Sequence, residues 1–147
     1  MARLWEIVAS AKLRLGAVVL DVENGAGVLI PLIQSYQPSA VLACDVAEKM
    51  LQRVQHKYPA VRTFHTGIVS LALASTSLDA IFMNGTYGII ADKPAACGNA
   101  ARMLRLGGRL MVRHPEGWAF VDQLRATSDL FIESPPTKEK FEVRLEP

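Results

Sequence analysis

Short apolar runs alternate with longer segments of helical spacing along most of the chain, and this alternation limits the possible folds more than any other feature. The runs are rich in aliphatic residues and lie within 17–20, 41–44, 61–64, 80–83 and 109–112. Three of them are almost wholly apolar, which is typical of parallel strands covered on both faces. Strands that alternate with helices form right-handed βαβ crossovers. The sequence therefore predicts a doubly wound, Rossmann-like α/β fold, with a mostly parallel sheet of about five strands and helices on both faces.

Three segments between or before these runs carry apolar residues at the spacing of one helix face. The first opens the chain and is expected to end near Gly16. The second begins near Ala47. The third covers roughly 94–106, with Gly107 and Gly108 as its stop signal.

The last part of the chain, 116–147, is expected to be a helical tail. One helix is predicted over 116–126, and a second, short helix after Pro136. A strand is the alternative for the second segment, because Phe141, Val143 and Leu145 alternate along it. We favour the helix, since Thr137 can cap it and Pro136 cannot join a ladder.

A sheet that ends at its fifth strand would leave the strand at 109–113 as an exposed edge. Another copy of the chain could cover this edge, which makes a homodimer through it a candidate assembly. We expect one domain over 1–147, with a core at about 15–115.

Composition narrows the function classes. The chain has 147 residues and a net charge of +2, from 16 basic and 14 acidic residues that are scattered rather than clustered. No apolar run approaches the roughly 18 residues that span a bilayer. We therefore expect no nucleic-acid or membrane partner. Two cysteines are too few for a disulfide framework, so a cytoplasmic or other reducing intracellular location is expected. The three histidines share no ligand spacing with the cysteines, so no metal site is expected.

The loop after the first predicted strand has the composition of a ligand-binding turn. It runs from Asp21 to Gly27 and contains Gly25 and Gly27, where the backbone could approach a ligand closely. The helix that follows would direct its amides at a carboxylate. The second strand ends at Asp45, 24 residues after Asp21, where a carboxylate can accept hydrogen bonds from two ribose hydroxyls.

These motifs resemble those of the class I S-adenosylmethionine-dependent methyltransferases, especially the small type 11 group. Residues 21–27 are similar to their Asp-x-Gly-x-Gly-x-Gly motif, and 45–51 to the acidic residue and helix start that follow. Residues 77–81 resemble their Ser-Phe-Asp approach to the fourth strand. Residues 101–110, Ala-Arg-Met-Leu-Arg-Leu-Gly-Gly-Arg-Leu, resemble their Arg-Val-Leu-Lys-Pro-Gly-Gly-Arg-Leu. The matches keep the family's order from about residue 15 to 115.

The resemblance implies S-adenosylmethionine as cofactor and a role for each matched position. Asp21 belongs to the first loop, which would hold the methionine end of the cofactor through Glu23, Asn24, Gly25 and Gly27. Asp45 would bind the ribose. The remaining implied contacts are one adenine face (Val46, Met50), the adenine edge (Gly67, Ile68) and the transferring methyl group (Asn84).

Three departures from the family pattern point to a truncated or diverged member. Glu23 replaces the first glycine of the loop, and its charge would lie near the carboxylate of the cofactor. Gly67 stands where an acidic residue usually bonds the adenine amino group. The family's last two strands are expected to be lacking.

Two further features have alternative interpretations. Asn84-Gly85-Thr86-Tyr87 lies in the register of the Asn-Pro-Pro-Tyr motif of amino-group methyltransferases, but a plain glycine turn is favoured. Four arginines could bind an anion together, although solvated positions on separate elements are favoured. These arginines are Arg102, Arg105, Arg109 and Arg113.

The sequence thus predicts a methyltransferase that acts on a small-molecule acceptor, with no catalytic residue identified. The alternative is a non-catalytic binding module or partner subunit of the same fold, with weak or no cofactor binding. A nicotinamide enzyme is disfavoured, because Ile30 occupies the position of the third glycine in the dinucleotide fingerprint.

Overall fold

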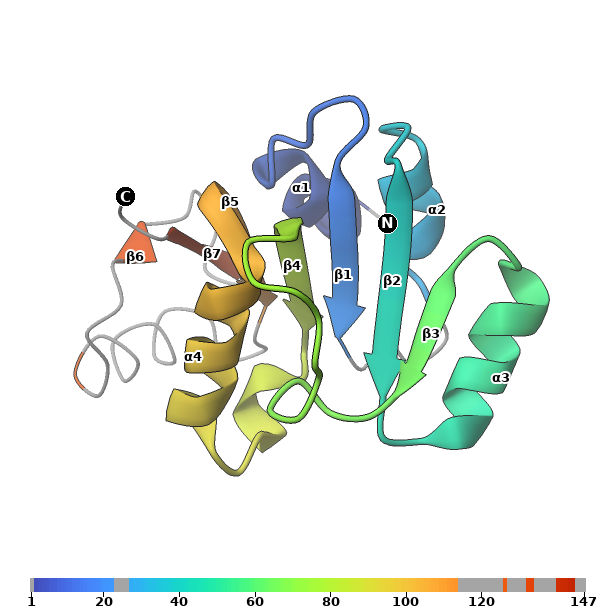
Figure 1. The fold of residues 1–147 in the computed structure, drawn as a ribbon. Helices are drawn as coiled ribbons and strands as arrows, with labels where there is room; N and C mark the ends of the chain where they lie inside the picture. Colours follow the sequence, from blue (N-terminus) through green and yellow to red (C-terminus); the bar gives the residue numbers. More distant parts are fainter. Residues whose placement is uncertain (1, 23–26, 114–125, 127–131, 134–139, 145–147) are drawn as a thin grey trace.

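The computed structural model describes residues 2–22, 27–113, 126, 132–133 and 140–144 (Figure 1). Within them, a central sheet has the strand order β3-β2-β1-β4-β5-β7-β6. Its strands are β1 (Val18–Val22), β2 (Ala40–Asp45), β3 (Arg62–His65), β4 (Leu78–Asn84), β5 (Leu104–Arg113), β6 (Ile132–Glu133) and β7 (Lys140–Arg144). The helices are α1 (Ala2–Ser10), α2 (Ile30–Gln34), α3 (Glu48–Lys57), α4 (Lys93–Met103) and the 3₁₀ turn η1 (Tyr87–Ile89).

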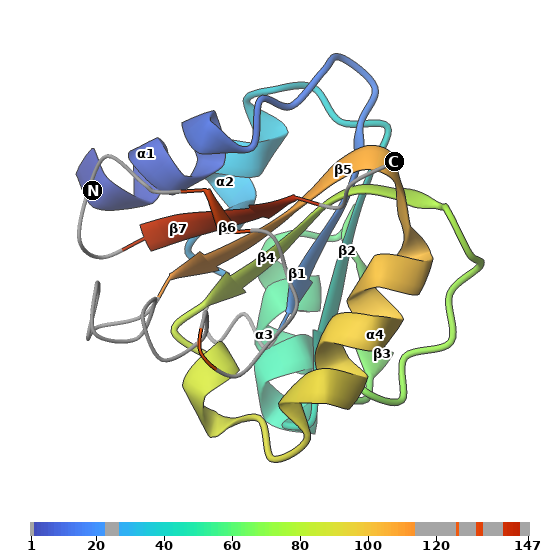
Figure 2. The ribbon, with the colours of Figure 1, turned by 90° about the vertical axis from the view of Figure 1, so that its left-hand side faces the viewer.

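The first five strands are parallel, as predicted, and the chain order reverses direction between β1 and β4. Successive residues of each strand face opposite layers. Val19 of β1 packs in one layer with α1 and α2, whereas Leu20 packs in the other with α4. Figure 2 shows α1 and α2 on one side of the sheet and α4 on the other. The doubly wound α/β fold is confirmed.

The helices predicted to begin near Ala47 and to cover roughly 94–106 are both present, as α3 and α4. The side chain of Asp92 accepts a hydrogen bond from Ala95 N at 3.0 Å and so caps α4. The helix stops at Met103, not near 106 as predicted, because β5 begins at Leu104. The opening helix α1 likewise ends at Ser10, before Gly16.

The glycine pair after α4 lies inside β5, not in a helix stop. Leu78 pairs with Leu104 and Ala80 pairs with Arg109, so Asp79 alone faces the four residues 105–108. These four residues form a bulge. Gly107 has φ +79°, and a Cβ at Gly108 would lie 2.8 Å from Arg105 O, which a glycine avoids.

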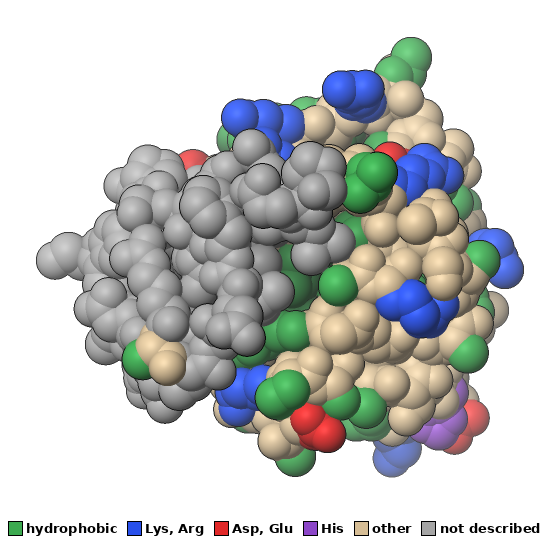
Figure 3. Space-filling view, turned by 60° about the vertical axis from the view of Figure 1, so that its left-hand side comes forward, with side chains coloured by type: hydrophobic (Ala, Val, Ile, Leu, Met, Phe, Trp, Pro, Cys, Tyr) green, Lys and Arg blue, Asp and Glu red, His purple; other side chains and the backbone are tan. Residues whose placement is uncertain are grey.

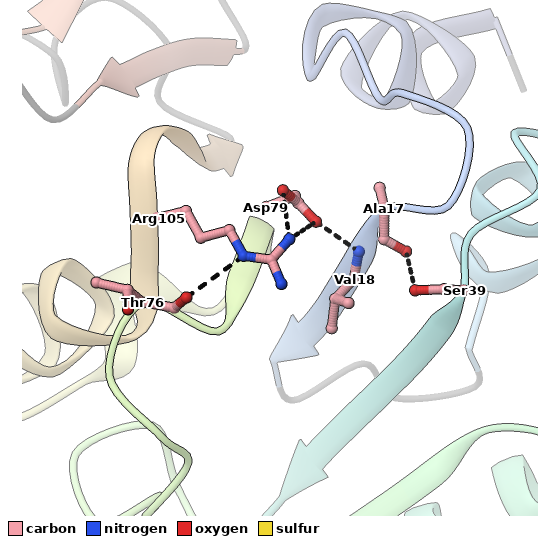
Figure 4. A network of polar contacts seen from close by, with 6 residues as sticks. All are labelled: Ala17, Val18, Ser39, Thr76, Asp79 and Arg105. Atoms are coloured by element: carbon pink, nitrogen blue, oxygen red, sulfur yellow. Dashed lines mark hydrogen bonds and ion pairs between the residues drawn. The ribbon is translucent and has the colours of Figure 1, made fainter.

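Asp79 joins this bulge to the start of β1 (Figure 4). Its Oδ2 accepts a hydrogen bond from Val18 N at 2.8 Å. Both carboxylate oxygens also contact Arg105 Nη1, at 3.0 and 3.1 Å. One carboxylate therefore fixes the amino-terminal ends of β1, β4 and β5 relative to one another.

The helix predicted after Pro136 is wrong, whereas Ala126, the last residue of the helix predicted over 116–126, is helical. Residues 140–144 form β7, which pairs antiparallel with β5, and 132–133 form β6, which pairs antiparallel with β7. The alternation of Phe141 and Val143 thus indicated the correct structure. The strand forms because β7 provides hydrogen-bond partners for the backbone groups on the outer edge of β5. The segment 116–125, predicted as most of a helix, lies outside the described residues.

Two expectations built on a five-stranded sheet are corrected with it. The sheet carries two short strands beyond β5, where none was expected. The outer edge of β5 is occupied by β7 from Arg109 to Arg113, so it is not open for a second copy of the chain. The homodimer was predicted because β5 was expected to be an exposed edge strand, and β5 is not one.

The four arginines that might have formed an anion site are distributed over the molecule. Arg102 lies on α4 and donates to Leu73 O at 2.7 Å, whereas Arg105 and Arg113 lie at opposite ends of β5. On the face drawn in Figure 3, Lys and Arg side chains form separate groups. Within the described residues, no helix has the length and apolar character that crossing a membrane requires.

Candidate functional site

The predicted site residues on β1, β2 and β4 gather at the carboxyl ends of the parallel strands. Asp21 lies in β1 and is 1% exposed. Asp45 ends β2, and Asn84 ends β4. These strands are neighbours in the sheet, so their carboxyl ends form one edge (Figure 1). In open α/β sheets this edge, at the reversal of strand order, is where ligands bind.

The loop between β1 and α2 is described only at its end. Glu23, Asn24 and Gly25 lie outside the described residues. Gly27 has φ +73°, and a Cβ there would lie 2.9 Å from Ile30 Cδ1 and 3.4 Å from Val54 Cγ2. Packing against α2 and α3 therefore requires this glycine, which is a different reason from the ligand approach expected at this position.

Asp45 has one carboxylate oxygen engaged and one available. Its Oδ1 accepts a hydrogen bond from Ala47 N at 2.8 Å, which orients the side chain at the start of α3. Its Oδ2 makes no hydrogen bond with any described residue. Asp45 is only 6% exposed, so its carboxylate is largely buried at this edge of the sheet. Such a carboxylate can accept a hydrogen bond from a hydroxyl group of a bound ligand.

An apolar wall lies next to Asp45. Val46 is 63% exposed, and its carbonyl lies 3.0 Å from His65 Nε2, which ties the end of β2 to the end of β3. Met50 is half-buried on α3. A Cβ on Gly67 would lie 3.5 Å from Val46 Cγ1, so the absence of a side chain keeps the space beside Val46 open.

Ile68, predicted at the same wall, directs its side chain into the core. It is 2% exposed and packs in the layer beneath α4, so only its backbone is available to a ligand. Asn99 of α4, which the sequence analysis did not identify, donates to Ile68 O at 2.6 Å and to Leu71 O at 2.9 Å. It thereby fixes the backbone of this segment. An asparagine within a helix gives no sequence signal for such a contact.

The turn after β4 differs from the Asn-Pro-Pro-Tyr arrangement at its tyrosine. Tyr87 is 2% exposed, and its hydroxyl lies 3.2 Å from Cys97 Sγ. Burial, and then this hydrogen bond, raise the pKa of Tyr87 above its ordinary value. Burial also raises the pKa of the Cys97 thiol. Tyr87 is thus a core residue, whereas Asn84 ends β4.

A cavity of about 440 Å³ lies at the opposite rim of the sheet. Its lining includes Leu15, Asp79, Arg105 and Leu106, from the amino-terminal ends of the strands. It is therefore separated from the Asp45 edge by the length of the strands.

Comparison with protein families gives a match to the family described as "Methyltransferase domain" over residues 20–112. The match runs from within β1 to within β5 and includes Asp21, Asp45 and Asn84. The chain belongs to this family. The match supports S-adenosylmethionine as the cofactor. Comparison with curated proteins gives no match.

Solved structures share the fold of this methyltransferase domain. A SAM-dependent methyltransferase from Aquifex aeolicus has a TM-score of 0.78 and 20% identity, with 95% of this chain and 87% of that one covered. A putative methyltransferase of Haloferax volcanii, in complex with the Trm112 activator, has a TM-score of 0.79 and 16% identity, with 90% of this chain and 71% of that one covered. The [4+2]-cyclase SpnF has a TM-score of 0.68 and 20% identity, with 76% of this chain and 44% of that one covered.

The described residues fit a nucleoside ligand. A carboxylate with one oxygen available, an exposed valine and a position without a side chain lie together at the strand edge. The acidic residue that usually follows the third strand is absent, because Gly67 lies there, so its charge-assisted contact to an adenine amino group is lost.

Proposed function

We propose that this methyltransferase domain transfers a methyl group from S-adenosylmethionine to a small-molecule acceptor. The proposal depends above all on Asp45, whose oriented carboxylate keeps Oδ2 available beside the exposed Val46. Asp45 would accept hydrogen bonds from the ribose hydroxyls. Val46 and Met50 would contact one adenine face, and the backbone at Gly67 and Ile68 the adenine edge.

The methionine end of the cofactor would lie over β1 and the loop that follows it. Asp21, Glu23, Asn24, Gly25 and Gly27 are the proposed contacts there. Asn84, at the end of the adjacent β4, would lie beside the methyl group. In this arrangement the cofactor would run across the carboxyl ends of β2, β1 and β4, which are neighbours in the sheet.

The chemistry requires little from the protein beyond alignment. When bound, S-adenosylmethionine supplies a sulfonium methyl group, which a nucleophile's lone pair takes as the carbon–sulfur bond breaks, leaving S-adenosylhomocysteine. The residues of this chain hold and orient the two reactants, which lowers the entropic cost of bringing them together. The nucleophile also loses a proton, and no side chain among the described residues is assigned as the base that takes it.

Calorimetry with S-adenosylhomocysteine tests this proposal. We expect micromolar binding to the wild-type chain and a loss of at least about tenfold in Asp45→Asn, which keeps the acceptor for Ala47 N but removes the charge. Glu48→Gln is the matched control, because it removes an exposed carboxylate three residues away. No heat at millimolar ligand, or equal binding by the Asp45 and Glu48 variants, would contradict the proposal.

The second candidate is a non-catalytic module with weak or no cofactor binding. It is supported by Gly67 in place of an acidic residue and by the fold's occurrence in a cyclase. A partner subunit of this kind could not use the β5 edge, which β7 covers. The absence of S-adenosylhomocysteine binding would favour this candidate.

A further inference from the structure

Arg113 ends β5 beside the proposed methyl-transfer position. It is the register partner of Asn84 in β4. The carbonyl of Arg113 accepts a hydrogen bond from Gly85 N at 2.8 Å, which fixes the two strand ends side by side. Its guanidinium thus borders the part of the edge where an acceptor would meet the methyl group.

The charge of Arg113 has no counter-charge among the described residues. Its Nη1 donates to the neutral Asn84 Oδ1 at 3.4 Å, which is a long hydrogen bond. Its Nε is buried and has no partner within the same described part of the chain. Arg105, at the other end of β5, instead contacts both oxygens of Asp79. A partly buried guanidinium without an anion is costly, and a bound anion would remove that cost.

A second polar group, in the turn after β4, also has no partner among the described residues. Thr86 is 8% exposed, and its buried Oγ1 makes no hydrogen bond within the part of the chain that the structure describes. Folded proteins leave few such atoms unsatisfied, and those that remain often belong to binding sites. Two donors without a partner among the described residues thus belong to the end of β5 and to the turn that follows β4.

We propose that Arg113 binds a carboxylate of the methyl acceptor, and that Thr86 supplies a further hydrogen-bond donor to it. This inference rests on the proposed function, because it specifies the acceptor of that same site. A guanidinium matches a carboxylate in charge and in its fork-shaped geometry. A phosphate dianion fits less well, since Arg113 is a single cation and the carboxylates of Asp21 and Asp45 lie on the same edge of the sheet.

Nuclear magnetic resonance tests the inference without measuring turnover. The Nε–Hε signal of Arg113 is assigned as the signal that Arg113→Lys lacks. The ¹⁵N-labelled chain is titrated with benzoate and, separately, with the uncharged benzamide, both with and without saturating S-adenosylhomocysteine. We expect benzoate to shift this signal and to bind at least about tenfold more tightly than benzamide.

Two variants complete the test. Arg113→Gln should lose at least about tenfold in benzoate affinity. Arg62→Gln is the control and should keep the wild-type affinity, because it removes an exposed arginine at the amino-terminal end of β3, away from the candidate site. Equal binding of benzoate and benzamide, or no shift of the Arg113 signal, would overturn the inference. If Arg113→Gln does not fold, Arg113→Lys and the wild-type titration decide.

The failures of the two proposals are distinguishable. If S-adenosylhomocysteine does not bind, the proposed function fails, and the titration without it still decides whether Arg113 binds a carboxylate. If S-adenosylhomocysteine binds and benzoate leaves the signal unmoved, only the inference about the acceptor fails.

Discussion

Gly27 illustrates how a single residue connects the candidate site to the core. It follows the loop that would hold the methionine end of the cofactor, and its positive φ of +73° is costly for a residue with a side chain. The space around it is filled by Ile30 and Val54, which belong to α2 and α3. The conformation of the loop's end is therefore set by packing on the protein side.

We expect Gly27→Ala to lower the free energy of unfolding by about 1–3 kcal/mol, because the added Cβ combines backbone strain with a contact of 2.9 Å to Ile30. Gly98→Ala is the control. Gly98 lies within α4, and a Cβ there would meet nothing within 4 Å, so alanine should stabilise by about 0.5–1 kcal/mol. Urea unfolding measures both, and similar effects of the two substitutions would contradict the argument.

At the scale of elements, parallel strands need their starts aligned as well as their ends. Asp79 supplies this alignment by binding Val18 N and the Arg105 bulge (Figure 4). The two contacts differ in strength, because the first is partly buried and satisfies a backbone donor. The second is a salt bridge whose side chains are 49% and 34% exposed, and such pairs contribute little.

Asp79→Ala should therefore destabilise more than the loss of its arginine partner. We expect a decrease of about 1.5–3 kcal/mol for Asp79→Ala, which leaves Val18 N without its partner, and of about 0–1 kcal/mol for Arg105→Gln. Thermal and urea unfolding of both variants give the comparison. Equal losses would mean that the ion pair, rather than the bond to β1, carries the stability.

Several elements could be predicted from sequence because their signals are local. The apolar spacing of α3 predicted its start near Ala47, and Ala47 is the residue that immediately precedes the helix. The helix predicted to follow Pro136 was wrong because Thr137 and Pro136 describe only the immediate neighbourhood. Whether 140–144 becomes a strand depends on β5, which is far away in sequence and offers unsatisfied backbone groups.

At the scale of the whole molecule, β7 covers the outer edge of β5. Its antiparallel pairing with β5 runs from Arg109 to Arg113, opposite Arg144 to Lys140. An uncovered β5 would present a row of hydrogen-bonding groups to other chains. The covering strand thus bears on association as well as on stability.

Val143→Pro should open this edge. Val143 pairs with Leu110 of β5 and Ile132 of β6, and proline there removes a ladder donor in the middle of β7. We expect unfolding to become easier by about 1–3 kcal/mol and larger species to form in size-exclusion chromatography with light scattering. Val143→Ala, which keeps the N–H, should associate no more than the wild type. Identical elution of the two variants would contradict this role of β7.

The sequence by itself determined the parallel αβ alternation and the placement of Asp21, Asp45 and Asn84 at one edge of the sheet. Those features follow from periodicity and spacing along the chain, which neighbouring residues encode. Only the tertiary structure decided that β7 covers β5 and that Arg113 lies against Asn84 with no counter-charge among the described residues. Strand register and the satisfaction of buried polar groups depend on contacts between distant segments, so no local pattern specifies them.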